Sequence, residues 1–195
     1  MPRAPRAIED DHCYHIITRG NDRKRLFRCT EDFTYFTKII REEASRYPIL
    51  LYNYCFMNNH VHMLIRSIKA DDVSLFFKNV FQRYASYFRK RYYHTGYLFQ
   101  NRFKDISIDK DSYLLECARY IERNPLRAGI VKNLSDYKWS SYLYYAEGKE
   151  NDIITENIMY STLGNSEIER KKRYVGYLNE ERAYEHIVDQ GLMKG

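Results

Sequence analysis

The sequence has few cysteines, few glycines and no long apolar segment, and each shortage excludes a class of protein. The four cysteines are widely spaced and form no Cys-x-x-Cys pair, which argues against a structural zinc site and against a disulfide framework. No run approaches the roughly 18 apolar residues of a membrane span, and residues 1–20 contain no apolar signal-peptide core. We therefore expect a cytoplasmic protein that is neither exported nor inserted in a membrane. The eight glycines form no phosphate-binding loop, so nothing in the sequence indicates ATP binding.

What the chain does contain describes a globular protein with an uneven charge. Its 195 residues fit one main domain, and 44% hydrophobic with 30% charged residues is an ordinary composition. Residues 146–195 hold 7 basic and 10 acidic side chains, a net charge of −3, which leaves 25 and 16, or +9, for residues 1–145. This basic part of the chain favours a polyanionic partner.

Two histidines, His60 and His62, open a predicted strand and are separated by one residue. Side chains two apart on a strand point to the same face, with α-carbons ~6.5 Å apart, so both imidazoles can reach one metal ion. Asn58 and Asn59 suit the tight turn before the strand, because asparagine tolerates a left-handed backbone. The same pair can also be two unrelated surface or core histidines. A third ligand or a nucleophile elsewhere would favour the metal site.

Hydrophobic periodicity predicts the element order β-α-β-β-α-β-α. Period-two and β-branched segments indicate strands, and apolar residues at three- and four-residue spacing indicate helices. The expected strands are 12–18, 49–57, 60–66 and 103–108. The expected helices are 30–47 with Thr30 as its cap, 71–92, and a third from Asp109 or Asp111 to about Asn124, before Pro125.

This order is typical of a ferredoxin-like α+β fold, an antiparallel sheet with two helices on one face. Val61, Met63 and Ile65 alternate with the two histidines and would lie under those helices. His60 and His62 would then lie on the opposite face. We expect the third helix to cross that face.

The chain divides into three expected parts. Residues 1–11, with two prolines and mixed charges, are expected to form a mobile N-terminal arm. Residues 12–145 hold the predicted sheet and helices, and residues 146–195 form a weakly patterned helical appendage for which we predict no role.

Residues 92–104 interleave aromatic and basic side chains. Such a segment can stack on unpaired bases and neutralise phosphates, although a buried aromatic loop edged by solvated cations has the same composition. From charge and position we predict these DNA contacts: Lys78, Arg83, Arg89, Lys90, Arg91, Arg102 and Lys104.

Tyr120 and Asn124 lie four residues apart on the third predicted helix and so project from nearly the same side. The Asn124 amide oxygen could add the missing ligand to the two histidines, which would leave the Tyr120 phenol beside the metal. The chain has 20 tyrosines, however, and most tyrosines are structural.

Four segments resemble one protein family. The stretch MNNHVHMLI at residues 57–65 resembles the His-hydrophobe-His motif of the single-tyrosine HUH transposases, the IS200-like family. In the same order, GYLFQNRF at 96–103, YIERNPLRAG at 120–129 and WSSY at 139–142 resemble its REP-associated tyrosine transposase branch. Asn58 stands where the family commonly has proline, which affects the turn and not the chemistry.

The resemblance implies roles for four residues. By position, the family's metal-binding histidines fall on His60 and His62, its nucleophilic tyrosine on Tyr120, and its polar third ligand on Asn124. Mixed nitrogen and oxygen ligands favour Mg²⁺ or Mn²⁺, although Zn²⁺ could occupy the same site. Residues 12–145 would then be the catalytic domain of an enzyme that cleaves single-stranded DNA next to a hairpin, holds the 5′ end as a phosphotyrosine and rejoins strands.

The expected partner is single-stranded or hairpin DNA. Related insertion-sequence transposases act as dimers with shared active sites, whereas the longer REP-associated type tends to act as a monomer. The resemblance therefore slightly favours a monomer over a homodimer.

Two other functions are compatible with the sequence. One is a DNA hairpin-binding protein that keeps the fold without turnover, against which the intact His60, His62 and Tyr120 argue. The other is a metal-dependent phosphoesterase that uses water as its nucleophile. Replacing Tyr120 by Phe separates the two enzymes, because cleavage would be lost in the transposase and kept in the phosphoesterase.

Overall fold

The computed structural model describes residues 7–180, which form an α+β fold around a four-stranded antiparallel sheet with the strand order β2-β3-β1-β4. The strands are β1 (Cys13–Arg19), β2 (Ile49–Met57), β3 (His60–Ser67) and β4 (Lys104–Ile108). The helices are α1 (Thr30–Ala44), α2 (Ala70–Tyr92), α3 (Ser112–Glu122), α4 (Asn124–Arg127), α5 (Tyr142–Glu147) and α6 (Glu167–Asn179). Three short 3-10 turns are η1 (Asn21–Arg23), η2 (Leu134–Asp136) and η3 (Ser161–Leu163). Residues 1–6 and 181–195, which belong to the expected arm and appendage, lie outside the described part.

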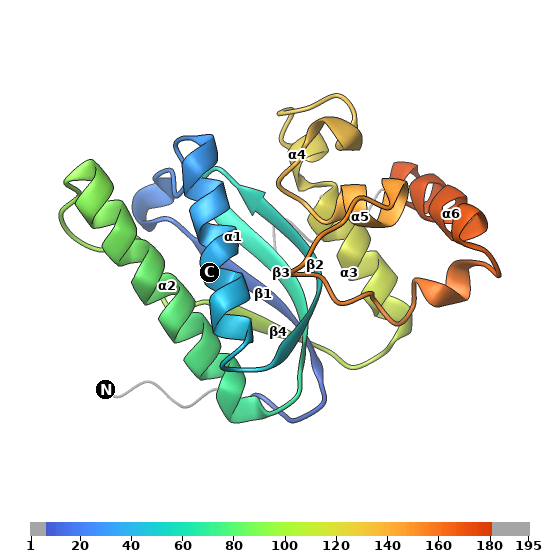
Figure 1. Cartoon of the computed structure of the whole chain (residues 1–195), viewed down its shortest axis with the longest axis horizontal. Helices are drawn as coiled ribbons and strands as arrows, with labels where there is room; N and C mark the ends of the chain where they lie inside the picture. The colour runs from blue at the N-terminus through green and yellow to red at the C-terminus, as the bar shows by residue number, and fades with distance from the viewer. Residues whose placement is uncertain (1–6, 181–195) are drawn as a thin grey trace.

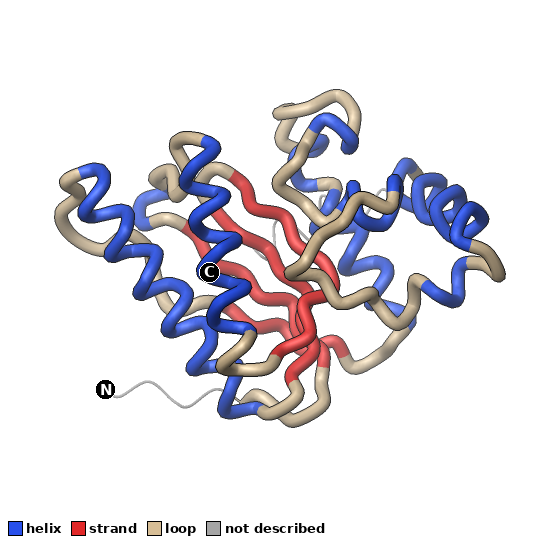
Figure 2. Tube along the Cα trace, in the orientation of Figure 1, coloured by secondary structure: helices blue, strands red, loops and turns tan. Residues whose placement is uncertain are grey.

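The predicted ferredoxin-like α+β class is confirmed. Figure 1 shows α1 and α2 together on one side of the sheet, and α3 and the later helices on the other. Figure 2 shows the same arrangement as one layer of strands between two groups of helices. The predicted Thr30 cap is wrong: Cys29 occupies the N-cap position in extended backbone, and the first turn is tied by the Asp32 carboxylate, which accepts the Arg28 N–H at 2.8 Å.

The end of the third predicted helix is divided. Helix α3 ends at Glu122, and the separate short helix α4 begins at Asn124. Pro125 falls in the first turn of α4, where its missing N–H interrupts no intrahelical hydrogen bond. Asn124 is therefore buried at the start of a helix and is not part of a frayed end.

The two faces of the sheet bury different sets of residues. Val61, Met63 and Ile65 pack into the larger core under α1 and α2, as the alternation predicts. The same core takes most of the α2 aromatic side chains. Leu64 points the other way, into a second core that includes Leu114 and other α3 residues. The histidine face of β3 is thus the face that α3 covers.

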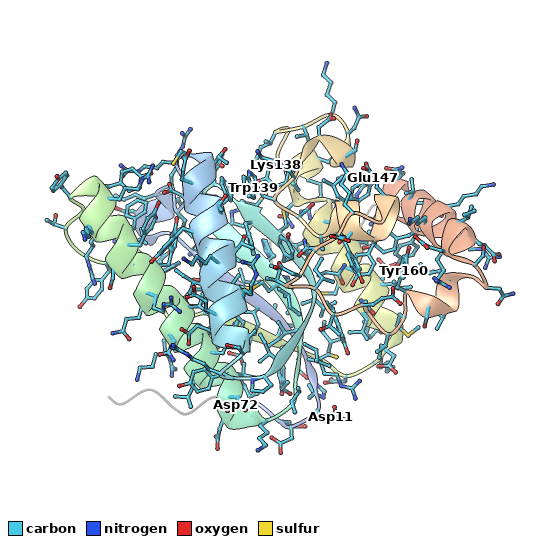
Figure 3. The ribbon with its side chains drawn as sticks, in the orientation of Figure 1. Asp11, Asp72, Lys138, Trp139, Glu147 and Tyr160 are labelled. Atoms are coloured by element: carbon cyan, nitrogen blue, oxygen red, sulfur yellow. The ribbon has the colours of Figure 1, made fainter. Side chains whose placement is uncertain are left out.

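The outer edge of β2 is covered by the segment before α5. The N–H of Phe56 donates to Trp139 O at 2.9 Å, and the N–H of Ser141 donates to Tyr54 O at 3.0 Å. Trp139 also stacks on Phe33 of α1, with ring centroids 4.5 Å apart, and Figure 3 shows it beside one end of that helix. This segment therefore closes an edge that would otherwise expose unpaired backbone groups.

Helix α6 is fastened to α3. The Arg119 Nε donates to Tyr177 O at 3.1 Å, and the Arg123 Nη1 donates to Leu178 O at 2.5 Å. These two carbonyls belong to the last turn of α6, where helices lack internal donors. Among residues 7–180, no helix is long and apolar enough to cross a membrane.

A buried polar network joins the same elements. The Glu122 carboxylate accepts hydrogen bonds from Asn53 of β2 and Tyr174 of α6, both at 2.9 Å, and from the Ser141 hydroxyl. A third apolar cluster surrounds this region, with Leu134, Tyr142, Tyr145, Tyr160, Tyr174 and Leu178 as its buried members.

Candidate active site

The pairing of β1 with β3 brings three histidines to one face of the sheet. His62 lies opposite Ile17, and His60 lies opposite Arg19. His15 is two residues before Ile17 and therefore points to the same face. The ring centroids of His60 and His62 are 4.9 Å apart, and those of His15 and His62 are 5.1 Å apart.

Tyr120 lies against two of these imidazoles. Its ring centroid is 5.8 Å from that of His62 and 5.7 Å from that of His15. The apolar stripe of α3, including Ala118 and Ile121, is buried against the sheet and turns Tyr120 inward. The structure thus brings together the predicted nucleophile and the predicted histidine pair, which are 58 residues or more apart in the chain.

Asn124 follows one turn after Tyr120. Its side-chain nitrogen donates to the Tyr120 carbonyl at 2.9 Å and to the Ile121 carbonyl at 3.1 Å. These two bonds use the amide nitrogen and leave the amide oxygen for another partner. The side chain is close enough to His60 to raise the pKa of that imidazole.

The three imidazoles are neutral at pH 7. Burial lowers the pKa of His15 to about 3 and is the largest cause lowering that of His60 to about 4, with Arg19 adding to the second shift and Asn124 opposing it. Burial also holds the pKa of His62 well below its usual value, with His60 as the next cause. A neutral imidazole keeps one nitrogen lone pair, which is the form that binds metals.

One ring nitrogen of each of the two predicted histidine ligands has no hydrogen-bond partner among residues 7–180. The Nε2 atoms of His60 and His62 are buried and have no hydrogen-bond partner within the described part of the chain. Their Nδ1 atoms, by contrast, are engaged, with Asn59 and His15 respectively. Two buried nitrogens that have no partner among residues 7–180, together with the Asn124 amide, are a donor set that suits a small divalent cation.

No cluster of three or more histidine, cysteine, aspartate or glutamate side chains that could hold a metal exists within residues 7–180. The predicted third ligand, Asn124, is not one of these residue types.

Arg127 of α4 lies over the ring of Tyr120. Its guanidinium carbon is 4.7 Å from the centroid of the Tyr120 ring. Burial raises the pKa of Tyr120, and Arg127 opposes this shift through its charge and a side-chain hydrogen bond. A cation in this place would stabilise a phenolate at Tyr120.

The site opens into a pocket of about 370 Å³. His60, His62 and Tyr120 form part of its wall, and Arg19, Arg23, Arg102 and Lys104 line the rest together with several amide side chains. The pocket thus offers positive charge beside a phenol and two imidazoles, an arrangement suited to a phosphate diester.

The predicted DNA contacts fall into two groups. Arg102 and Lys104 line the pocket. The other five, Lys78, Arg83, Arg89, Lys90 and Arg91, lie on α2, which covers the opposite face of the sheet.

Two of those α2 cations have acidic neighbours. Arg83 forms ion pairs with Glu42 and Glu43 of α1. Arg91 lies 3.7 Å from Asp32.

Sequence reasoning did not single out His15, Arg19, Arg23 or Arg127. His15 and Arg19 had a usable signal, because alternation along residues 13–19 places them on one face of β1. The ferredoxin-like order then places β1 beside the histidine strand. Arg127 had no such signal, since its position depends on the break between α3 and α4.

Comparison with known proteins agrees with this geometry. The family model described as "Transposase IS200 like" matches residues 9–124, more than half of the chain. The fold matches a structure of a REP-associated tyrosine transposase bound to a REP hairpin, with a TM-score of 0.65 and 18% identity over 81% of this chain and 93% of that one. A candidate transposase from Deinococcus radiodurans R1 aligns with 18% identity over 69% of this chain and 97% of that one, at a TM-score of 0.42. No curated protein sequence matches the chain.

The family model covers β1 to α3 and ends at Asn124, so it contains His60, His62 and Tyr120. The match is to the chain's own sequence, whereas the structural likeness concerns the fold. The predicted family is confirmed: the chain belongs to the IS200-like transposases.

Proposed function

We propose that this transposase cleaves single-stranded DNA beside a hairpin and rejoins strands through a 5′-phosphotyrosine on Tyr120. The observation that carries the proposal is the Tyr120 phenol beside His60 and His62, whose buried Nε2 atoms have no partner among residues 7–180. The hairpin bound to the REP-associated transposase of similar fold supports hairpin DNA as the partner.

The proposed cleavage exchanges one phosphate ester for another. The Tyr120 oxygen bonds to the scissile phosphorus, the bond from phosphorus to the 3′ oxygen breaks, and the phenol proton ends on the released 3′-hydroxyl. Strand joining is the reverse reaction, in which a 3′-hydroxyl displaces Tyr120. The ester keeps the energy of the broken bond, so no ATP is required.

Arg127 would support both cleavage and strand joining. A phenol has a reference pKa of about 10 and needs help to react as phenolate at neutral pH. The guanidinium over the Tyr120 ring supplies a fixed positive charge for this purpose.

The predicted metal fits this site. His60, His62 and Asn124 would hold Mg²⁺ or Mn²⁺ through two neutral imidazoles and one amide oxygen. When bound, such an ion polarises the scissile phosphate and offsets the charge that develops on it.

The basic pocket wall is the proposed path for the DNA next to the scissile phosphate. Arg102 and Lys104, together with Arg19 and Arg23, would contact its phosphates. The five α2 cations stay predicted contacts for DNA that extends beyond the pocket.

A covalent-capture experiment tests the proposal. The protein is incubated with a labelled pool of single-stranded hairpins, with Mg²⁺, Mn²⁺ or EDTA, and the products are resolved on a denaturing gel and by peptide mass spectrometry. We expect a metal-dependent adduct on Tyr120 that Tyr120→Phe abolishes. Tyr113→Phe is the matched control, because Tyr113 lies on the same helix and is 56% exposed.

Two other outcomes would each identify a different function. Metal-dependent cleavage without an adduct, unaffected by Tyr120→Phe, would identify the water-using phosphoesterase. Tight hairpin binding without cleavage or adduct would identify the non-catalytic binding protein.

A further inference from the structure

The Nδ1 atom of each predicted histidine ligand is within hydrogen-bond distance of another side chain. The His60 Nδ1 lies 2.7 Å from the Asn59 Oδ1. The His62 Nδ1 lies 2.9 Å from the Nε2 of His15. In both rings the opposite nitrogen, Nε2, is the one without a partner within the described chain.

For His60 the proton position follows from the donor types. An amide oxygen only accepts, so the His60 Nδ1 must carry the hydrogen. The Asn59 amide nitrogen donates to Arg23 O at 3.4 Å, which keeps the amide oxygen toward His60. The His60 Nε2 therefore presents a lone pair.

For His62 two arrangements satisfy the bond to His15. If His15 donates, the hydrogen of His62 lies on Nε2 and that atom cannot bind a cation. If His62 donates from Nδ1, its Nε2 presents a lone pair beside that of His60. Only the second arrangement builds a two-nitrogen site.

We propose that His15 and Asn59 are positioning residues, which hold His62 and His60 as Nδ1–H tautomers and so direct both Nε2 lone pairs at one metal ion. The inference rests on the proposed metal-dependent function. Ligand histidines in general donate their second N–H to a partner that fixes ring orientation and tautomer.

The surroundings hold the His15–His62 pair rigidly. His15 is 4% exposed and His62 is 2% exposed, so water cannot replace one partner of the pair. His15 is also fixed by the β1 ladder to both β3 and β4. Neither partner carries a negative charge, so the site keeps the full positive charge of the ion for a phosphate.

The first measurement locates the protons without DNA. Long-range proton–nitrogen NMR on ¹⁵N-histidine-labelled protein, free of metal, should place the hydrogen of His60 and His62 on Nδ1. A hydrogen on the His62 Nε2 would overturn the proposal.

The second measurement is the affinity for Mn²⁺ alone, by calorimetry. His15→Leu removes the acceptor and should weaken binding about 10–100-fold. His15→Gln should restore most of the affinity, because the Gln Oε1 can accept from the His62 Nδ1. Asn59→Ala should weaken binding similarly, and Asn59→Asp should retain it.

His12→Gln is the matched control, because His12 lies just before the same strand and its Nε2 contacts the Ser107 hydroxyl at 2.7 Å, away from the site. It should leave Mn²⁺ affinity unchanged. Circular dichroism confirms that each variant is folded.

Wild-type affinity in folded His15→Leu, or no Mn²⁺ binding by the unmodified protein, would refute the proposal. If Mn²⁺ binds and the tautomers are as stated but no DNA adduct forms, only the proposed function fails.

Discussion

The two faces of the sheet are made by the same strands but bury different chemistry. Under α1 and α2 lie Val61, Met63 and Ile65 in an apolar and aromatic core. Under α3 the alternate residues of β3 include His60 and His62, which lose hydration on burial, as their lowered pKa values indicate. Burial of apolar side chains under α1 and α2 therefore stabilises the fold, whereas burial of the two histidines under α3 costs free energy.

One tyrosine from each face gives the strongest test of this division. Tyr120→Phe should lower cleavage on the order of 10³-fold or more, about 4 kcal/mol of barrier, with little loss of stability. Tyr84→Phe should keep cleavage and cost about 1–3 kcal/mol, because the Tyr84 hydroxyl donates to the buried Leu26 carbonyl at 2.7 Å. Gel assays of cleavage and urea unfolding measure the two effects, and equal loss of activity in both variants would contradict the division.

Neighbouring residues of β3 allow a second test. His60→Ala should abolish Mn²⁺ binding and cleavage while changing the free energy of unfolding by about 1 kcal/mol or less. Met63→Ala should cost about 2–5 kcal/mol through the cavity it leaves, with metal binding retained in the folded fraction. Stable metal binding by His60→Ala would remove His60 from the site.

The Glu122 network predicts a pH effect on stability. Burial raises the pKa of Glu122 to about 7, against hydrogen bonds from Ser141, Asn53 and Tyr174. Because the folded pKa lies above the unfolded one, the contribution to stability is complete below about pH 4.5 and is lost as pH rises through 7. Its size is at most roughly 3 kcal/mol.

The matched variant is Glu122→Gln, which stays neutral. Urea unfolding at pH 5 and pH 8 should show the wild type losing stability relative to this variant at the higher pH. A constant difference between the two proteins would show that the Glu122 carboxyl does not titrate in this range.

The smallest expected effects concern DNA affinity. Arg102→Ala and Lys104→Ala should each weaken hairpin binding several-fold and lower the slope of log affinity against log salt by about 1. Lys78→Ala tests the α2 group in the same titration by electrophoretic mobility. If Lys78→Ala reduces the slope and the pocket variants do not, the DNA lies on the α2 face instead.

Period-two and period-3.6 patterns were enough to predict the fold and two halves of the site. They placed His60 and His62 on one face of a strand, and Tyr120 and Asn124 on one side of a helix. The family resemblance supplied the predicted roles of these residues. The partnership of His15 with His62 needs the register of β1 against β3, which no local pattern encodes. The side of the sheet to which each cation belongs also follows only from the assembled fold.

The residues after 145 also make contacts that local sequence patterns could not predict. The pattern indicated helix there, and α6 is present. Its contact with Glu122 through Tyr174 joins residues 52 apart in sequence, so no local pattern could reveal it.

The attachment of α6 to α3 has a consequence for protein synthesis. Arg119 is 1% exposed, and its Nε bonds to Tyr177 O, an atom that the ribosome adds long after α3 has been made. Until that part of the chain emerges, the helix that carries Tyr120 has only one of its two packing surfaces. During synthesis the helix that carries Tyr120 can therefore pack on the sheet first, and it gains its second packing surface only after Tyr177 and Leu178 have emerged.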